Sequence, residues 1–170
     1  MKRLIGSLLA LLLAFSLGST ALAQTYYFSL DKEVVHVYWN ADGTSALDYT
    51  FTFSNSPTAS PMEFVDVGLP NGNYDLGSIS AEVDGQAVGV SSDYQGDGPY
   101  GVAISLGSYA IQPGQSGNVR VYVGRIRNVL YNDDEDKAYA SGVFSPTWFD
   151  SQFVYGSTDL TVVFHLPPGV

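Results

Sequence analysis

Cysteine is absent from the 170-residue sequence. The chain therefore has no disulfides, no cysteine nucleophile and no thiolate ligands for zinc, and we expect packing alone to hold its fold. Basic residues are also few: the sequence has 7 Lys and Arg and 17 Asp and Glu. Such an acidic surface repels phosphate backbones and anionic lipid headgroups, which argues against nucleic-acid binding and against charge-driven attachment to membranes.

The first residues have the pattern of a secretory signal peptide. A basic start at residues 1–3 precedes an apolar run at 8–17 and a small-x-small motif at 21–23. The apolar run is too short to span a bilayer comfortably. We expect residues 1–23 to be a cleaved signal peptide and residues 24–170 to be extracytoplasmic.

Apolar residues beyond the predicted signal peptide alternate in steps of two, which is typical of strands. The clearest run is LDYTFTFS at 47–54, and a similar run at 35–39 precedes it. The connection at 40–43 reads Asn-Ala-Asp-Gly, where the glycine accepts the positive φ of a tight turn. These residues predict a β-hairpin.

Further short strands are expected along the rest of the chain. They lie at 62–67, 79–83, 86–90, 102–106, 119–130 and 160–166, separated by Gly-, Pro- and Asn-containing turns. The parity of the apolar residues shifts by one beside Gly124, which predicts a β-bulge. The inward-facing set is expected to be Val35, Val37, Trp39, Leu47, Tyr49, Phe51, Phe53, Ile79, Ala81, Val83, Val102, Ile104, Leu106, Val119, Val121, Val123, Leu160, Val162, Phe164 and Leu166.

This spacing predicts an all-β fold, an antiparallel β-sandwich of immunoglobulin-like or jelly-roll-like type. Residues 24–170 are enough for one domain with a substantial core. The sequence stops at Pro167-Pro168-Gly169-Val170, directly after a predicted strand. We therefore expect the domain to be truncated at its C-terminal end, with any membrane attachment made by a segment beyond it.

Four consecutive acids form the densest charge cluster, Asp133-Asp134-Glu135-Asp136. Asp133, Asp134 and Asp136 are candidate calcium ligands, since calcium takes several converging oxygens. However, the loop pattern of an EF-hand is absent, and adjacent side chains on an extended segment diverge. A solvated connection is the favoured interpretation, with its charge partly balanced by Arg125 or Arg127.

Motifs for catalysis or for a cofactor are not found. His36 and His165 fall on outward-facing positions of two separate predicted strands, and no carboxylate spacing around them suggests zinc. Gly114-Gln115-Ser116-Gly117 lacks the spacing of a nucleophile elbow. We expect a non-enzymatic protein without a cofactor, although a carboxylate pair for glycoside hydrolysis is set in three dimensions and stays open.

Aromatic residues are numerous and divide into two expected groups. Trp39 and Trp148 are predicted to be core residues, and residues 139–149 are predicted to return to the core with a bend at Pro146. Tyr94 and Tyr100 flank a polar, glycine-rich loop and are the candidates for a binding surface, because loops carry function.

Three stretches together resemble a known family. They are VVHVYWNADGTSALDYTFTF, VRVYVGRIRNVLYNDDEDKAYASGVFSPTWF and LTVVFHLPPGV. They resemble the secreted N-terminal domain of an uncharacterised family of predicted bacterial membrane proteins, in which a hairpin with a DG turn opens the domain. The resemblance implies an extracytoplasmic β-sandwich attached to transmembrane helices, and it implies no catalytic residues.

Two functions are consistent with these expectations. The first is a non-catalytic ectodomain of a bacterial envelope or membrane protein, which binds a protein or another cell-envelope component and is monomeric as an isolated domain. The alternative is a carbohydrate-binding module or a small glycan-acting enzyme.

Overall fold

The computed structural model describes residues 25–167, and the predicted signal peptide lies outside this range. The described chain is all-β, with two single-turn 3-10 helices, η1 (Leu76–Ser78) and η2 (Gly107–Tyr109). No helix in this range is long and apolar enough to span a membrane. The strands are β1 (Phe28–Trp39), β2 (Ser45–Asn55), β3 (Phe64–Gly68), β4 (Ile79–Val83), β5 (Gln86–Ser91), β6 (Gly101–Ser105), β7 (Ser116–Ile126), β8 (Leu130–Asn132), β9 (Ala140–Gly142) and β10 (Asp159–His165).

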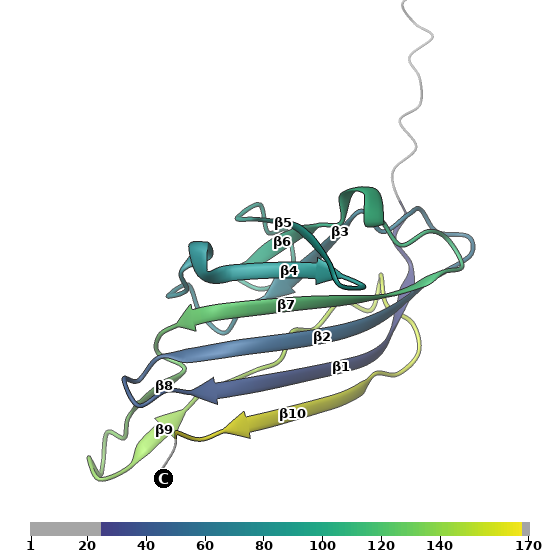
Figure 1. Ribbon diagram of the computed structural model, residues 1–170. Coiled ribbons are helices and arrows are strands. Elements are labelled where there is room, and N and C mark those ends of the chain that lie inside the picture. The colour runs from purple at the N-terminus through teal and green to yellow at the C-terminus, as the bar shows by residue number, and fades with distance from the viewer. Residues whose placement is uncertain (1–24, 168–170) are drawn as a thin grey trace, which may run out of the picture.

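Eight strands form one curled sheet in the order β10-β1-β2-β7-β4-β5-β6-β3 (Figure 1). The predicted hairpin is confirmed as β1 and β2, with Gly43 at φ 78° in the turn. Strands β8 and β9 pair separately as a short ribbon. The curl brings β3 and β6 over β2 and β7, so one sheet supplies both sides of the core.

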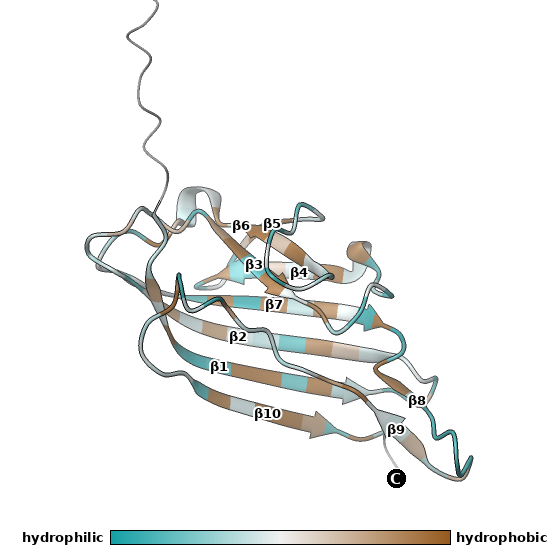
Figure 2. Ribbon diagram, turned by 180° about the vertical axis from the view of Figure 1, so that it is seen from behind, coloured by the Kyte–Doolittle hydropathy of each residue, from teal (hydrophilic) through white to brown (hydrophobic). Residues whose placement is uncertain are grey.

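The expectation of purely antiparallel pairing is wrong at one edge, where β10 runs parallel to β1. The chain reaches the starting end of β10 through residues 143–158, the crossover segment, which connects β9 to β10. This segment runs back across the face of β1 and β2 (Figure 2). It meets the start of β1, where the Phe28 amide donates to the Phe153 carbonyl at 2.9 Å. Strand β10 then follows β1 in the same direction.

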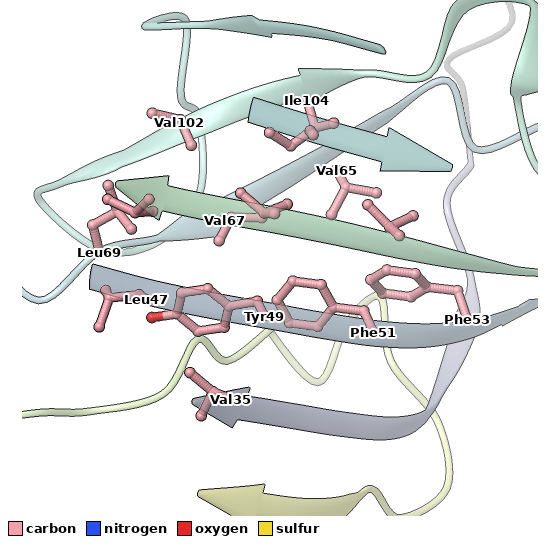
Figure 3. Close-up of a cluster of buried hydrophobic side chains, with 14 of the residues drawn as sticks. Val35, Leu47, Tyr49, Phe51, Phe53, Val65, Val67, Leu69, Val102 and Ile104 are labelled. Carbon is pink, nitrogen blue, oxygen red and sulfur yellow. The ribbon is translucent and has the colours of Figure 1, made fainter. Parts of the chain in front are cut away.

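The core is built on the alternation that the sequence shows most clearly. Leu47, Tyr49, Phe51 and Phe53 of β2 are fully buried and point in the same direction. They face Val65 and Val67 of β3 and Val102 and Ile104 of β6 (Figure 3). The inward phase predicted for β1, β2, β6 and the first half of β7 is therefore confirmed.

Two bulges set the phase of the long strands. Ser45 pairs with Ile126 whereas Leu47 pairs with Val123, so β7 carries one extra residue beside Gly124, as predicted. A second bulge was not predicted: Leu30 pairs with Phe53 and Lys32 with Thr52, so β1 has an extra residue at Asp31. This bulge turns Glu33, Val35 and Val37 toward the core.

Two groups of predicted core residues are exposed instead. Leu160, Phe164 and Leu166 are 48%, 49% and 55% exposed because β10 is an edge strand and the described chain leaves much of its apolar face uncovered. Trp148 is 63% exposed and Tyr139 is also exposed, so the core assignment was wrong for both. Trp39, Phe144 and Phe149 do pack against the core.

Candidate functional site

An open groove of about 250 Å³ lies beside β3. Its lining comes from parts of the chain that are distant in sequence: residues 26–28 at the start of β1, the end of β2, residues 62–66 leading into β3, the loop at 92–100 and the crossover segment at 148–153. Most of the lining is aromatic, namely Tyr26, Phe28, Phe53, Phe64, Tyr94, Trp148, Phe149 and Phe153. Three carboxylates, Asp66, Asp97 and Asp150, also line it, and none of the lining residues is basic.

The crossover segment presents Trp148 by simple alternation along an extended chain. Thr147 is buried, Trp148 is 63% exposed, and Phe149 is again turned inward. The Phe149 ring meets Phe28 and Phe53 edge-on, each with ring centres 5.6 Å apart. Because its two neighbours are held in the core, Trp148 is fixed on the rim of the groove.

Tyr94 forms the opposite wall and is held by its own loop. Its ring lies directly over the α-carbon of Gly101, where a side chain would collide with it. The Gly98 amide donates to its hydroxyl at 3.2 Å. Burial raises the pKa of the Tyr94 hydroxyl, and the nearby Asp66 and Asp97 add to the effect. The ring is therefore a preformed surface.

The carboxylates have different partners. Asp66 accepts a hydrogen bond from the Gln95 amide at 3.2 Å, which ties the loop to β3. Burial nevertheless raises the pKa of Asp66. Asp150 accepts from the Gln152 amide at 2.9 Å and closes the turn at the end of the groove. No lysine or arginine neutralises these groups within the groove, so its electrostatic potential is negative.

A buried polar cluster lies under the crossover segment. Glu33 of β1 is only 2% exposed, and its Oε1 atom has no hydrogen-bond partner in the described chain. Burial raises the pKa of Glu33 to about 7, although the backbone amide of Thr147 donates to the carboxyl and lowers it. The Thr147 hydroxyl donates to the Gly68 carbonyl at 2.7 Å. Burial and the Glu33 charge raise the pKa of the nearby Tyr49 hydroxyl.

The sequence predictions captured the groove only in part. Tyr94 lines it, as the prediction of a binding surface there required. Tyr100 is 46% exposed but its ring packs over Gly72, outside the groove. Phe64 and Trp148 were missed. For the strand expected at 62–67, the sequence did not show which side chains face outward. Trp148 lies among other aromatic residues and was interpreted as a core residue. Glu33 was missed because the bulge at Asp31, which the sequence did not reveal, is what turns the Glu33 side chain toward the core.

The acidic run closes on itself as a loop between β8 and β9. Asp133 accepts hydrogen bonds from the amides of Glu135 and Asp136 at 2.9 and 3.0 Å and from the Ser141 hydroxyl at 2.6 Å. These bonds lower the pKa of Asp133. The Asp136 carboxylate accepts a hydrogen bond from the Ala138 amide, so it caps a turn other than the one that Asp133 caps. Within residues 25–167, no three Asp, Glu or His side chains are grouped so that they could hold a metal ion.

The predicted pairing of this loop with Arg125 or Arg127 is wrong, because within the part of the chain that the structure describes no ion pair joins either arginine to residues 133–136. Arg125 lies 3.7 Å from Asp42 in the β1–β2 turn. The cation beside the acidic loop is its own Lys137, 3.5 Å from Asp134. The end of β7 lies beside the β1–β2 turn, since Ile126 pairs with Ser45, and Asp42 of that turn is therefore the carboxylate that Arg125 meets.

The two histidines meet, because the parallel pairing makes β1 and β10 neighbours. His36 Nδ1 and His165 Nε2 are 2.7 Å apart and the ring centres are 5.0 Å apart, so the nitrogens point at each other as in a hydrogen bond. The Tyr38 ring stacks on His165 with centres 4.3 Å apart. These rings lie on the outer face of the sheet, away from the groove.

Comparison with known proteins gives only distant structural matches. No protein-family model and no curated protein sequence matches the chain. A crystal structure of an M1 zinc metallopeptidase from Deinococcus radiodurans is 18% identical with a TM-score of 0.41, over 60% of this chain and 21% of that one. A two-domain M1 zinc metallopeptidase variant bound to L-arginine is 17% identical with a TM-score of 0.42, over 66% and 23%. The chain spans less than a quarter of their length, and TM-scores this low support no inference about activity.

Proposed function

We propose that the chain is a non-catalytic, exported binding domain of a bacterial envelope or membrane protein, and that it holds its partner in the groove between Tyr94 and Trp148. The N-terminal pattern supports export, and the resemblance to secreted N-terminal domains supports the envelope setting. Two parts of the curled sheet face each other as the layers of a β-sandwich do. The groove is the feature that specifies binding.

The observation that carries this proposal is the combination of exposed rings and unneutralised acids. Trp148 and Phe64 are 63% and 51% exposed at the rim, although large aromatic side chains are normally buried. Asp97 and Asp150 lie beside them without a basic residue in the lining. The faces of aromatic rings and carboxylates both attract cations. The groove therefore suits a partner segment that presents a lysine or arginine side chain among apolar ones.

Short peptides test this. A heptapeptide of alternating Lys and Leu should bind and quench or shift the fluorescence of exposed Trp148, and the peptide with Gln in place of Lys should bind more weakly. In calorimetry, Trp148→Ala should weaken binding roughly tenfold, because a cation–π partner contributes about 1–2 kcal/mol. Tyr122→Ala, which removes an exposed ring on the outer face of β7 that is not part of the groove lining, is the matched control. Equal affinity for the Lys and Gln peptides would refute the electrostatic reasoning.

A glycan ligand is the second candidate, because an exposed tryptophan beside carboxylates also suits a sugar ring and its hydroxyls. A neutral oligosaccharide, cellohexaose, separates the two. If it binds more tightly than the basic peptide and Trp148→Ala abolishes that binding, the groove is a carbohydrate site.

A further inference from the structure

Strand β10 is an unusual sheet edge. It is seven residues long, and none of its residues is a lysine or a proline, the residues that commonly guard edges. Thr161, Val162 and Val163 at its centre are all β-branched and favour strand pairing. Its far side has no pairing partner among residues 25–167, since it ends the strand order. The hydropathy colouring shows the strand as mainly apolar (Figure 2).

The opposite edge of the sheet is protected in ways that β10 is not. Strand β3 has five residues and begins after Pro61. In β3 the Gly68 carbonyl accepts a hydrogen bond from the Thr147 hydroxyl, and the Asp66 carboxylate accepts one from the Gln95 amide. A loop and the crossover segment therefore contact the edge strand β3. On β10 the crossover segment contacts only the face, through Phe144 against Phe164, and the outer edge is unpaired among residues 25–167.

The sequence of β10, DLTVVFH, is complementary to its own reverse, because each residue then faces one of a compatible type. In an antiparallel pair of two copies centred on Val162, Asp159 lies opposite His165, Leu160 opposite Phe164, and Thr161 opposite Val163. An acid thus meets a hydrogen-bonding imidazole, and an aliphatic side chain meets a ring. Such cross-strand pairs each contribute roughly 0.2–1 kcal/mol.

Backbone geometry agrees with the same register. Alternate residues of an edge strand direct their N–H and C=O groups outward. In a pair centred on Val162, odd-numbered residues lie opposite odd-numbered residues and even-numbered opposite even-numbered. The outward-directed N–H and C=O groups of one copy therefore meet those of the other. The same register places Leu160, Val162 and Phe164 of both copies on one face of the joined sheet. This is the apolar face, on which Trp39 also lies, with the ring centres of Trp39 and Phe164 5.2 Å apart.

We propose that β10 pairs antiparallel with β10 of a second copy of this chain, forming a two-fold dimer with one continuous sheet across the interface. A two-fold axis requires a self-complementary surface, and the complementary pairs of β10 supply it. The dimer leaves the groove of each copy free, so it is independent of the proposed binding function. It replaces the expectation of a monomer drawn from the sequence.

Sedimentation velocity over a range of protein concentrations tests the association. The purified chain should show a concentration-dependent dimer. Leu160→Lys, which sets a charge opposite Phe164 of the second copy, should weaken the dimer at least tenfold. Leu76→Lys, at a leucine on η1 that is 40% exposed against 48% for Leu160, should leave it unchanged. A chain that stays monomeric throughout, or equal weakening by both variants, overturns the proposal.

Cross-linking tests the register, and the natural absence of cysteine removes any background. Val162→Cys should form a disulfide-linked dimer under mild oxidation, because the two residues are directly opposite. Thr161→Cys alone should not, since its two copies would be about 8 Å apart, beyond the roughly 7 Å that a disulfide spans. A mixture of Thr161→Cys and Val163→Cys should cross-link between the two variants, which covers the case that Val162→Cys folds poorly. Absence of cross-links in both the Val162→Cys sample and the mixture, or self-linking of Thr161→Cys equal to that of Val162→Cys, overturns the proposed register.

Discussion

Glu33 should make the stability of this protein fall as the pH rises from about 4.5 to 7. Its folded pKa of about 7 lies above its usual value of 4.5. An acid with a raised folded pKa binds more protons when folded than when unfolded in that interval, so its stabilising contribution is complete below pH 4.5 and is lost by about pH 7 to 8. A difference of about 2.5 units corresponds to roughly 3 kcal/mol between the two limits.

The Glu33→Gln variant isolates this contribution. The amide keeps the shape of the neutral carboxyl and its acceptor for the Thr147 amide, but it cannot ionise. We expect wild type and variant to have similar free energies of unfolding at pH 4.5, and the variant to be more stable by up to about 3 kcal/mol at pH 8.

Urea titrations followed by circular dichroism at several pH values provide the measurement. The difference between wild type and variant is the useful quantity, because the effects of Asp66 and the surface acids cancel in it. Glu135→Gln, in the exposed acidic loop, is the matched control and should show no such trend. A difference between wild type and Glu33→Gln that is constant from pH 5 to 8 would refute the assignment of a buried, neutral carboxyl.

Further predictions follow from the core and the acidic loop. Phe51→Ala should destabilise the fold by roughly 3–5 kcal/mol in a urea titration, because the ring is fully buried. Thr52→Ala, on the outer face, should cost less than about 1 kcal/mol, and equal costs at the two positions would contradict the observed phase. Asp134→Asn should change stability by less than about 0.5 kcal/mol. Calcium should not raise the melting temperature, since the loop carboxylates diverge, and a clear rise would identify a metal site at 133–136.

Much of the fold could be predicted because one sheet face is buried almost throughout. In β2 every second residue is apolar, and a slip of one residue would expose Tyr49, Phe51 and Phe53 together. That cost fixes both the strand and its phase, so the hairpin and the bulge at Gly124 could be predicted from the sequence. The position of a strand within the sheet carries no such local signal. Strand β10 has the alternation of a core strand, and only the crossover reveals that it is a parallel edge.

The groove was harder to predict because its parts come together only through tertiary structure. Tyr94 was predicted to lie at a binding surface because it belongs to a loop, and this reason did not distinguish it from Tyr100, whose ring packs over Gly72 outside the groove. Trp148 carried the opposite signal, since aromatic clusters are usually buried. Its exposure depends on Thr147 and Phe149 both being directed inward, and that depends on the path of a segment without regular secondary structure.

The crossover segment connects the two least expected features of this protein. Thr147 satisfies an edge carbonyl of β3 and donates its amide to the buried Glu33, while the next residue supplies the exposed ring of the groove. A buried carboxyl with an unpaired oxygen is a poor choice for stability alone, since an apolar residue of similar size would avoid its desolvation. The Glu33 carboxyl instead positions the crossover segment, because the hydrogen bond that it accepts from the Thr147 amide fixes the register of that segment over the sheet. That register decides that Trp148 faces the groove and Phe149 the core. The polar cluster and the aromatic groove are therefore two consequences of the same short stretch of chain.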